Sequence, residues 1–146
     1  PQNNNSLIAA TSVGMYKSFN GGTTWTLCAS GNYQDAEWKT NDTTVVHVVT
    51  AAGYARSNNG GLSYTGITIA PGLNCNRLSL AVTPANANCL YILVSATNNG
   101  FGGLYRSTDG GNTWTLRSNS PNIFDWSTTG SGSFRGASMK AGNLSL

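Results

Sequence analysis

The sequence has few charged residues. Lys, Arg, Asp and Glu make up 9% of its 146 residues, against roughly a quarter in an ordinary soluble domain. The eight basic residues are scattered along the chain, so none of them forms a run that resembles a nucleic-acid-binding patch. We therefore expect no nucleic-acid partner, and the net charge of +3 indicates only a solubilised surface.

Long hydrophobic runs, metal-type cysteine spacings and leader segments are also missing. No apolar run approaches the roughly 18 residues of a membrane span, so we expect none. The three cysteines form no CxxC pair, which argues against a zinc site, and their odd number leaves open the disulfide status of Cys28, Cys75 and Cys89. We expect no metal and no cofactor. The start PQNNNS, without Met or a visible signal peptide, indicates a processed protein or an excised fragment.

One eight-residue segment recurs three times. It reads SFNGGTTW at 18–25, SNNGGLSY at 57–64 and STDGGNTW at 107–114, and we call these segments the three repeat turns. The likeness extends upstream as GMYKS, GYARS and GLYRS. Once a six-residue insertion within 96–103 is removed, the period is about 39 to 44 residues, the length of a four-stranded propeller blade.

Strand signals fit this period. SLIAAT, VVHVVT and CLYILVS are apolar or β-branched runs typical of buried strands, and GMYKS, GYARS and GLYRS follow them as third strands. DAEWKT and RLSLAVT precede them as first strands, while WTLCAS, YTGITI and WTLRSN follow the repeat turns as last strands. The sequence thus predicts an all-β fold, a β-propeller segment of about two and a half to three four-stranded blades within a larger propeller.

The predicted organisation follows from the repeat. Residues 1–120 are expected to form the blades, with a partial first blade at 1–31, a second at 32–70 and a third at 71–120. Residues 121–146 are expected to be a connector or a truncated next blade. Because blades bury their faces only against neighbours, further blades are expected, in the same chain or in an oligomer.

The repeat turns resemble the Asp-box, or BNR repeat, S-x-D-x-G-x-T-W. The third turn matches it at every position, the first has Asn for Asp, and the second matches more loosely. The matching residues are Ser18, Asn20, Gly22, Thr24, Trp25, Ser57, Asn59, Gly61, Ser63, Tyr64, Ser107, Asp109, Gly111, Thr113 and Trp114. Such repeats occur in the propellers of sialidases, sortilin-type receptors, xyloglucan-active glycoside hydrolases and a photosystem assembly factor. The fuller pattern looks most like propellers of large secreted proteins of the Bacteroidetes type, which implies an extracellular or cell-surface location.

The resemblance implies that the box is a structural turn between the third and fourth strands. Its chemistry agrees, because an Asp or Asn side chain accepts backbone N–H groups and glycine adopts positive φ without steric cost. Asn can replace Asp in that role but not in acid catalysis, so Asp109 is not expected to be catalytic. One carboxylate without EF-hand spacing also argues against a calcium loop.

The acidic residues of the first strands are further site candidates. Asp35 and Glu37 share one side of a predicted first strand, and first strands line the central channel of a propeller, where ligands often bind. Glycoside hydrolysis usually needs two carboxylates, which makes this pair the catalytic candidate, although a surface or inter-blade ion pair involving Lys39 is favoured. His47 lies between valines and is expected to be a packed or partly exposed strand histidine. Asp42 lies in a turn, where Asp is common.

Two aromatic residues are candidates for stacking on a ligand such as a sugar. They are Phe101, in the insertion, and Trp126.

Three functions remain open. The first, which we favour, is a non-catalytic scaffold or binding module for a glycan or protein ligand. The second is a fragment of a sialidase- or xyloglucanase-like glycoside hydrolase with its catalytic residues mostly elsewhere. The third is a self-assembling repeat that completes a ring or filament.

Overall fold

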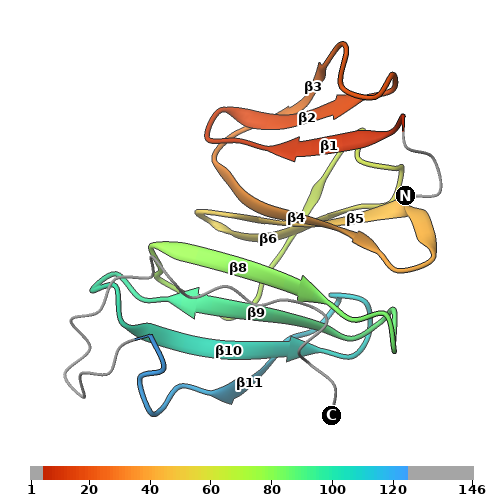
Figure 1. Cartoon of the computed structure of the whole chain (residues 1–146). Coiled ribbons are helices and arrows are strands. Elements are labelled where there is room, and N and C mark those ends of the chain that lie inside the picture. Colours follow the sequence, from red (N-terminus) through yellow and green to blue (C-terminus); the bar gives the residue numbers. More distant parts are fainter. Residues whose placement is uncertain (1–4, 125–146) are drawn as a thin grey trace.

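The computed structural model describes residues 5–124 and shows three antiparallel sheets, which we call blades 1 to 3 (Figure 1). Blade 1 has three strands and blades 2 and 3 have four each, with consecutive strands as neighbours. The strands are β1 (Leu7–Ala10), β2 (Gly14–Ser18) and β3 (Thr26–Ser30); β4 (Tyr33–Lys39), β5 (Asp42–Thr50), β6 (Gly53–Ser57) and β7 (Thr65–Ile67); and β8 (Arg77–Val82), β9 (Leu90–Ser95), β10 (Phe101–Ser107) and β11 (Thr115–Ser118).

No helix occurs within residues 5–124, so the predicted all-β class is confirmed. The three sheets follow one another in chain order from the top to the bottom of Figure 1. The first strand of blade 2, β4, contacts β1 on one side and β8 on the other. This side-by-side series of antiparallel meanders is the arrangement of consecutive propeller blades.

No helix in the described part of the chain is long and apolar enough to cross a membrane.

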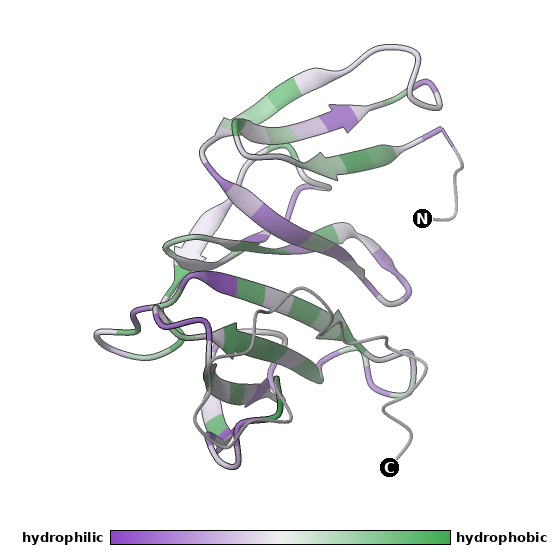
Figure 2. Cartoon of the chain, turned by 60° about the vertical axis from the view of Figure 1, so that its left-hand side comes forward, coloured by the Kyte–Doolittle hydropathy of each residue, from purple (hydrophilic) through white to green (hydrophobic). Residues whose placement is uncertain are grey.

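Two hydrophobic cores lie between the blades, one at each junction, and blade 2 contributes side chains to both. The core between blades 1 and 2 contains Met15 and Val48, and the core between blades 2 and 3 contains Val49, Leu78 and Ile92. Val48 and Val49 are adjacent in β5 and serve different cores, as the two-residue period of a strand requires. Figure 2 shows the resulting hydrophobic stretches on β8 and β9.

The insertion between β9 and β10 is a tight loop. Ala96 N–H donates to Gly100 O at 2.9 Å, and Asn99 adopts φ of 65°, a left-handed conformation that Asn tolerates. β10 begins at Phe101, two residues before the predicted third strand, so part of the inserted sequence extends this strand.

Candidate functional site

The three repeat turns share one hydrogen-bond pattern. In each turn the serine hydroxyl accepts the backbone N–H two positions later at 3.3 Å and the backbone N–H four positions later at 2.8 Å. The serines are buried, and the bonds that they accept from Gly61 and Gly111 satisfy buried N–H groups. The three serines are Ser18, Ser57 and Ser107.

The carboxylate of Asp109 is committed to its own turn. Oδ1 accepts the backbone N–H groups of Asn112 at 3.0 Å and Thr113 at 2.9 Å, and Oδ2 accepts the Thr113 hydroxyl at 2.6 Å. The side-chain and backbone hydrogen bonds of Thr113 hold the pKa of Asp109 at about 2. An ionised carboxylate held in this way is an acceptor for the turn.

The two turns with Asn reproduce this geometry without charge. Asn20 Oδ1 accepts the backbone N–H of Thr24 at 2.9 Å, and Asn59 Oδ1 accepts that of Ser63 at 3.0 Å. The hydroxyl four residues after the Asn or Asp changes its role. Those of Thr24 and Ser63 accept a hydrogen bond from the Asn amide, whereas that of Thr113 donates one to Asp109. Because a hydroxyl can do either, the turn accommodates both residues.

A basic side chain joins each blade to the turn of the next. Lys17 Nζ in blade 1 donates to the carbonyl oxygen of Gly60 at 2.5 Å, and Arg56 in blade 2 donates to that of Gly110 at 2.8 Å. The donors are equivalent in the repeat, as are the acceptors. The recurring cations therefore form contacts between blades, and Lys17 and Arg56 are both bound to the turn of the following blade.

In the second and third repeat turns, the aromatic residue that ends the turn packs on the preceding blade. Trp114 meets the ring of Tyr54 edge-on, with 5.0 Å between centroids, and Tyr64 packs in the core that contains Met15. Met15 and Tyr54 occupy equivalent positions, directly after the first glycine of the third strand. The turns thus supply both the polar and the apolar half of each inter-blade junction.

Asp35 points at the neighbouring blade. Its Oδ2 accepts the backbone N–H of Leu80 at 3.0 Å and the hydroxyl of Ser79 at 3.2 Å, both in β8. Glu37 is half-buried, and its pKa is raised by burial and by the charge of Asp35. No ion pair between Glu37 and Lys39 is found within residues 5–124, and the inter-blade partners of Asp35 are the neutral donors Ser79 and Leu80.

His47 is fully buried and faces Tyr54. Its Nδ1 lies 2.7 Å from Tyr54 Oη, and within residues 5–124 its Nε2 has no partner. Burial, together with the nearby charges of Arg56 and Lys39, lowers the pKa of His47 to about 4. The histidine is therefore neutral at pH 7 and packs between blades 2 and 3.

Acidification from pH 7 to pH 4 is expected to destabilise the protein through His47. The unfolded chain takes up a proton near pH 6.5 and the folded chain only near pH 4, so stability present above pH 6.5 is lost across this window, by about 3 kcal/mol. Urea unfolding as a function of pH measures the loss. His47→Gln should make the free energy of unfolding depend less on pH. The raised pKa of Glu37 changes stability in the opposite direction, but it does so equally in the wild type and in the variant. An unchanged profile in this variant would contradict the assignment.

The remaining predicted residues lie apart from one another. Asp42 caps its own turn, where Oδ1 accepts the backbone N–H of Thr44 at 3.0 Å and its hydroxyl at 2.6 Å. Phe101 packs against Phe124 with 5.4 Å between ring centroids and the ring planes at 74°, so part of its ring is already covered. Trp126 lies outside the described residues. The three cysteines, Cys28, Cys75 and Cys89, are free.

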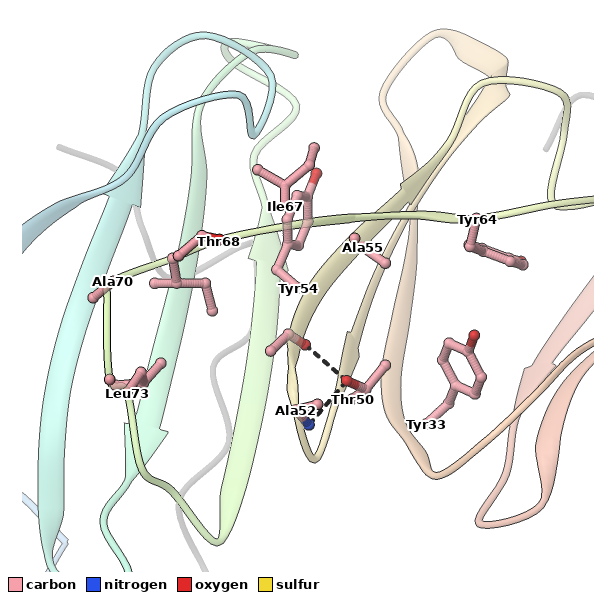
Figure 3. Close-up of a pocket in the computed structure, with 14 residues that line it drawn as sticks. Tyr33, Thr50, Ala52, Tyr54, Ala55, Tyr64, Ile67, Thr68, Ala70 and Leu73 are labelled. Carbon is pink, nitrogen blue, oxygen red and sulfur yellow. Dashed lines mark hydrogen bonds between the residues drawn. The ribbon is translucent and has the colours of Figure 1, made fainter.

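A cavity of about 510 Å³ lies beside β6 and β7 (Figure 3). Tyr33 and Tyr64 line one side of it and Leu73 lies on the other. Two of its hydroxyls are already engaged, because Thr50 Oγ1 accepts Ala52 N–H at 3.0 Å and the Tyr54 hydroxyl meets His47. Its wall combines apolar side chains at the margin of the inter-blade cores with the buried hydroxyl of Tyr64, which has no hydrogen-bond partner within residues 5–124.

A second cavity, about 360 Å³, lies where three blades meet and was not predicted from the sequence. It is lined by residues 10–12 at the end of β1, by 32–34 at the start of β4 and by 76–77 at the start of β8. We call it the three-blade pocket. Hydroxyl, amide and guanidinium groups gather there, and such groups recognise polar ligands. Residues 32–34 and 76–77 lie at the starts of equivalent strands, whereas 10–12 follow a different strand of the repeat, so only the fold brings the three segments together.

Hydrogen bonds between blades fix the side chains that line the three-blade pocket. Gln34 Nε2 donates to Asn76 O at 3.1 Å and Gln34 Oε1 accepts Leu78 N–H at 2.7 Å. The amide of Asn76 donates to Thr97 O and to Asn99 Oδ1, both at 2.9 Å. The insertion is thereby tied to this end of the blades.

No cluster of three or more potential metal ligands occurs in the part of the chain that the structure describes.

Comparisons with known proteins identify the fold. Neither a scan against protein-family models nor a search of curated proteins found a match. Among solved structures, an ancestral GH74 enzyme aligns with a TM-score of 0.67 and 23% identity over 80% of this chain and 17% of its own. YCF48 bound to D1 peptide aligns with a TM-score of 0.56 and 17% identity over 78% of this chain and 37% of its own. The chain is a β-propeller segment, and it spans well under half the length of these proteins.

Proposed function

We propose that the chain is a non-catalytic β-propeller segment that serves as a scaffold or binding module for a protein or glycan ligand. The observation that carries this proposal is the use of its carboxylates. Asp35, Asp42 and Asp109 all accept hydrogen bonds from neighbouring backbone and hydroxyl groups. Within residues 5–124 this leaves Glu37 as the one carboxyl without such a structural bond, whereas glycoside hydrolysis usually needs two.

The three-blade pocket is the binding site that we favour. Ser12 and Asn32 are exposed on its wall, and no hydrogen bond within residues 5–124 engages their side chains. Groups of this kind can bind the hydroxyls of a glycan or the backbone of a peptide. The fold likeness to YCF48 bound to a peptide is in keeping with a protein ligand. A secreted or cell-surface location, and membership of the Asp-box repeats, rest on the sequence of the repeat turns.

The second candidate is a fragment of a glycoside hydrolase. Two observations favour it, the fold likeness to a GH74 enzyme and the raised pKa of Glu37, which suits a general acid. In that case the second carboxylate lies outside residues 5–124.

A binding screen separates the two functions. The 146-residue chain is tested on a glycan array and a peptide library, and the affinity of the best binder is measured by calorimetry. We expect the double variant Ser12→Ala/Asn32→Ala to weaken this binding roughly 10-fold or more, since each lost hydrogen bond is worth about 1 kcal/mol. Asn58→Ala, an exposed amide in the second repeat turn, is the matched control and should bind as the wild type does.

Two results would count against the binding proposal. One is the absence of any binder that responds to the double variant. The other is release of reducing ends from a glycan such as xyloglucan that stops in Glu37→Gln, which would instead establish the hydrolase.

A further inference from the structure

Blade 2 lacks two large side chains that blades 1 and 3 carry at the same place. In each blade one residue of the third strand lies opposite one residue of the fourth strand, just after the repeat turn. These pairs are Tyr16 and Leu27 in blade 1, Ala55 and Gly66 in blade 2, and Tyr105 and Leu116 in blade 3. Blade 2 lies between the other two blades, so the difference belongs to the blade itself and not to an end of the chain.

The missing side chains leave a hollow. In blade 3 the leucine covers the first glycine of the third strand, since a Cβ added to Gly103 would meet Leu116 Cδ1 at 3.0 Å, and blade 1 is still more crowded at this position. A Cβ added to the equivalent Gly53, or to Gly66, would meet nothing within 4 Å. The cavity of about 510 Å³ beside β6 and β7 therefore opens where the other blades place a tyrosine and a leucine. We call it the blade 2 hollow.

The walls of the blade 2 hollow are aromatic and aliphatic. Tyr33 and Tyr64, with 5.9 Å between ring centroids, line one side and Leu73 lines the other, and Ala55 lies between them in the view of Figure 3. The two tyrosines pack against the core between blades 1 and 2, and Leu73 packs against the core between blades 2 and 3. The walls are thus held in place by both cores, and they suit an apolar group that leaves water.

The strand beside the hollow is a short edge strand. β7 is the last strand of its sheet and spans three residues, whereas β3 spans five and β11 spans four. In blades 1 and 3 the outer pairing continues to Ser30 and Ser118, but in blade 2 it stops where Tyr54 meets Ile67. The outer backbone groups of an edge strand can pair with another extended chain.

We propose that the blade 2 hollow binds an extended peptide segment of a partner protein, which runs along β7 and inserts one leucine or similar aliphatic side chain over Gly53 and Gly66. The leucines of blades 1 and 3 show what fits, because each reaches this place from an extended strand. Backbone hydrogen bonds at the edge supply affinity and the hollow selects the side chain, as in other cases of strand addition. Neither Ser12 nor Asn32 lines this hollow, so the site is separate from the three-blade pocket.

Two blocked tetrapeptides test the choice of side chain. The first, acetyl-TLRS-amide, has the sequence of β11, whose leucine fills the equivalent place in blade 3, and in the second glycine replaces this leucine. Titration of the isotope-labelled 146-residue chain followed by NMR measures both affinities, with shifts expected at the amides of Gly53 and Gly66. Leu27 and Leu116 are 51% and 45% exposed, so about half of a leucine side chain is buried at this place. We therefore expect the leucine peptide to bind roughly 5- to 10-fold more tightly. Equal affinities, or no binding of either peptide at millimolar concentration, would overturn the proposal.

Gly66→Leu gives blade 2 the side chain that the other blades carry. Because a Cβ at this position meets open space, the variant should fold with unchanged or higher thermal stability and should bind the leucine peptide roughly 5-fold or more weakly. Thr65→Leu is the matched control, since Thr65 is the exposed neighbour in β7 and its side chain points to the opposite face. Circular dichroism checks that both are folded. Undiminished binding in a folded Gly66→Leu variant would overturn the site.

A third variant separates this site from the three-blade pocket. Ser12→Ala/Asn32→Ala should bind the leucine peptide as the wild type does, whatever its effect on ligands of that pocket. Weaker binding of the tetrapeptide in this variant would move the peptide to the three-blade pocket and overturn the present assignment.

Two further results would assign the blade 2 hollow to another occupant and so overturn the peptide proposal. One is an equal affinity for N-acetylleucine amide, which would identify a site for a small molecule. The other is self-association of the unliganded chain, measured by sedimentation, that Gly66→Leu abolishes, which would identify a second copy of the chain as the occupant.

Discussion

Gly111→Ala is expected to lower the free energy of unfolding by about 3 to 4 kcal/mol, or to prevent folding. Gly111 has φ of 87°, a conformation that L side chains rarely adopt. A Cβ at this position would overlap Tyr54 Oη and lie 2.6 Å from Tyr54 Cζ. Tyr54 cannot move aside cheaply, since it is buried between His47 and Trp114. The substitution therefore combines backbone strain with a clash across the junction between blades 2 and 3.

The adjacent glycine is the matched control. Gly110 has φ of 73°, but a Cβ there would meet its nearest atoms only at 3.6 Å and 4.0 Å. Gly110→Ala should therefore cost only the strain of positive φ, about 1 kcal/mol. Urea unfolding of both variants at one protein concentration measures the difference. Equal losses would show that the clash with Tyr54 is relieved by repacking.

Asp35→Ala is expected to cost about 3 kcal/mol. The substitution removes an ionised acceptor and leaves the buried N–H of Leu80 without its partner, in addition to the lost bond to Ser79. Asp35→Asn retains one carbonyl oxygen and should cost less. The measurement is again equilibrium unfolding in urea, with far-UV circular dichroism as the probe.

Glu37→Ala is the control for Asp35, because it removes a carboxylate two residues away on the same strand. The raised pKa of Glu37 shows that its charged form is disfavoured in the fold, so its loss should be close to neutral or slightly stabilising. A neutral Asp35→Ala would contradict the structural role of Asp35, and it would return this residue to the catalytic candidates.

The strands could be predicted because their signals are local. GMYKS and GYARS coincide with β2 and β6, since the repeat fixes where each turn begins. The extra residues of β10 could not be foreseen, because the strand is extended by pairing of Phe101 with Ser95 across the loop. β7 is shorter than YTGITI indicates, and the chain leaves the sheet after Ile67 towards Pro71, which lacks a backbone donor.

The site residues divide in the same way. The turn role of Asp109 was open to prediction because its partners lie within four residues, and Asn at the equivalent positions showed that charge is dispensable. The partners of Asp35 are 44 and 45 residues away in another blade, so no local pattern reveals them. Gln34 and Asn76 line the three-blade pocket. Neither their residue type nor their spacing in the sequence indicates a binding site.

By itself, the sequence determined the repeat, its blade period, the all-β class and the residues that each turn requires, because all of these depend on contacts within one strand pair or one turn. Only the tertiary structure decided which groups meet across blades. It joined Arg56 to Gly110 and turned Asp35 towards β8. The physical reason is that a blade completes neither its hydrogen bonds nor its core alone, so the roles of its outward-facing residues are set by the neighbour that packs against it.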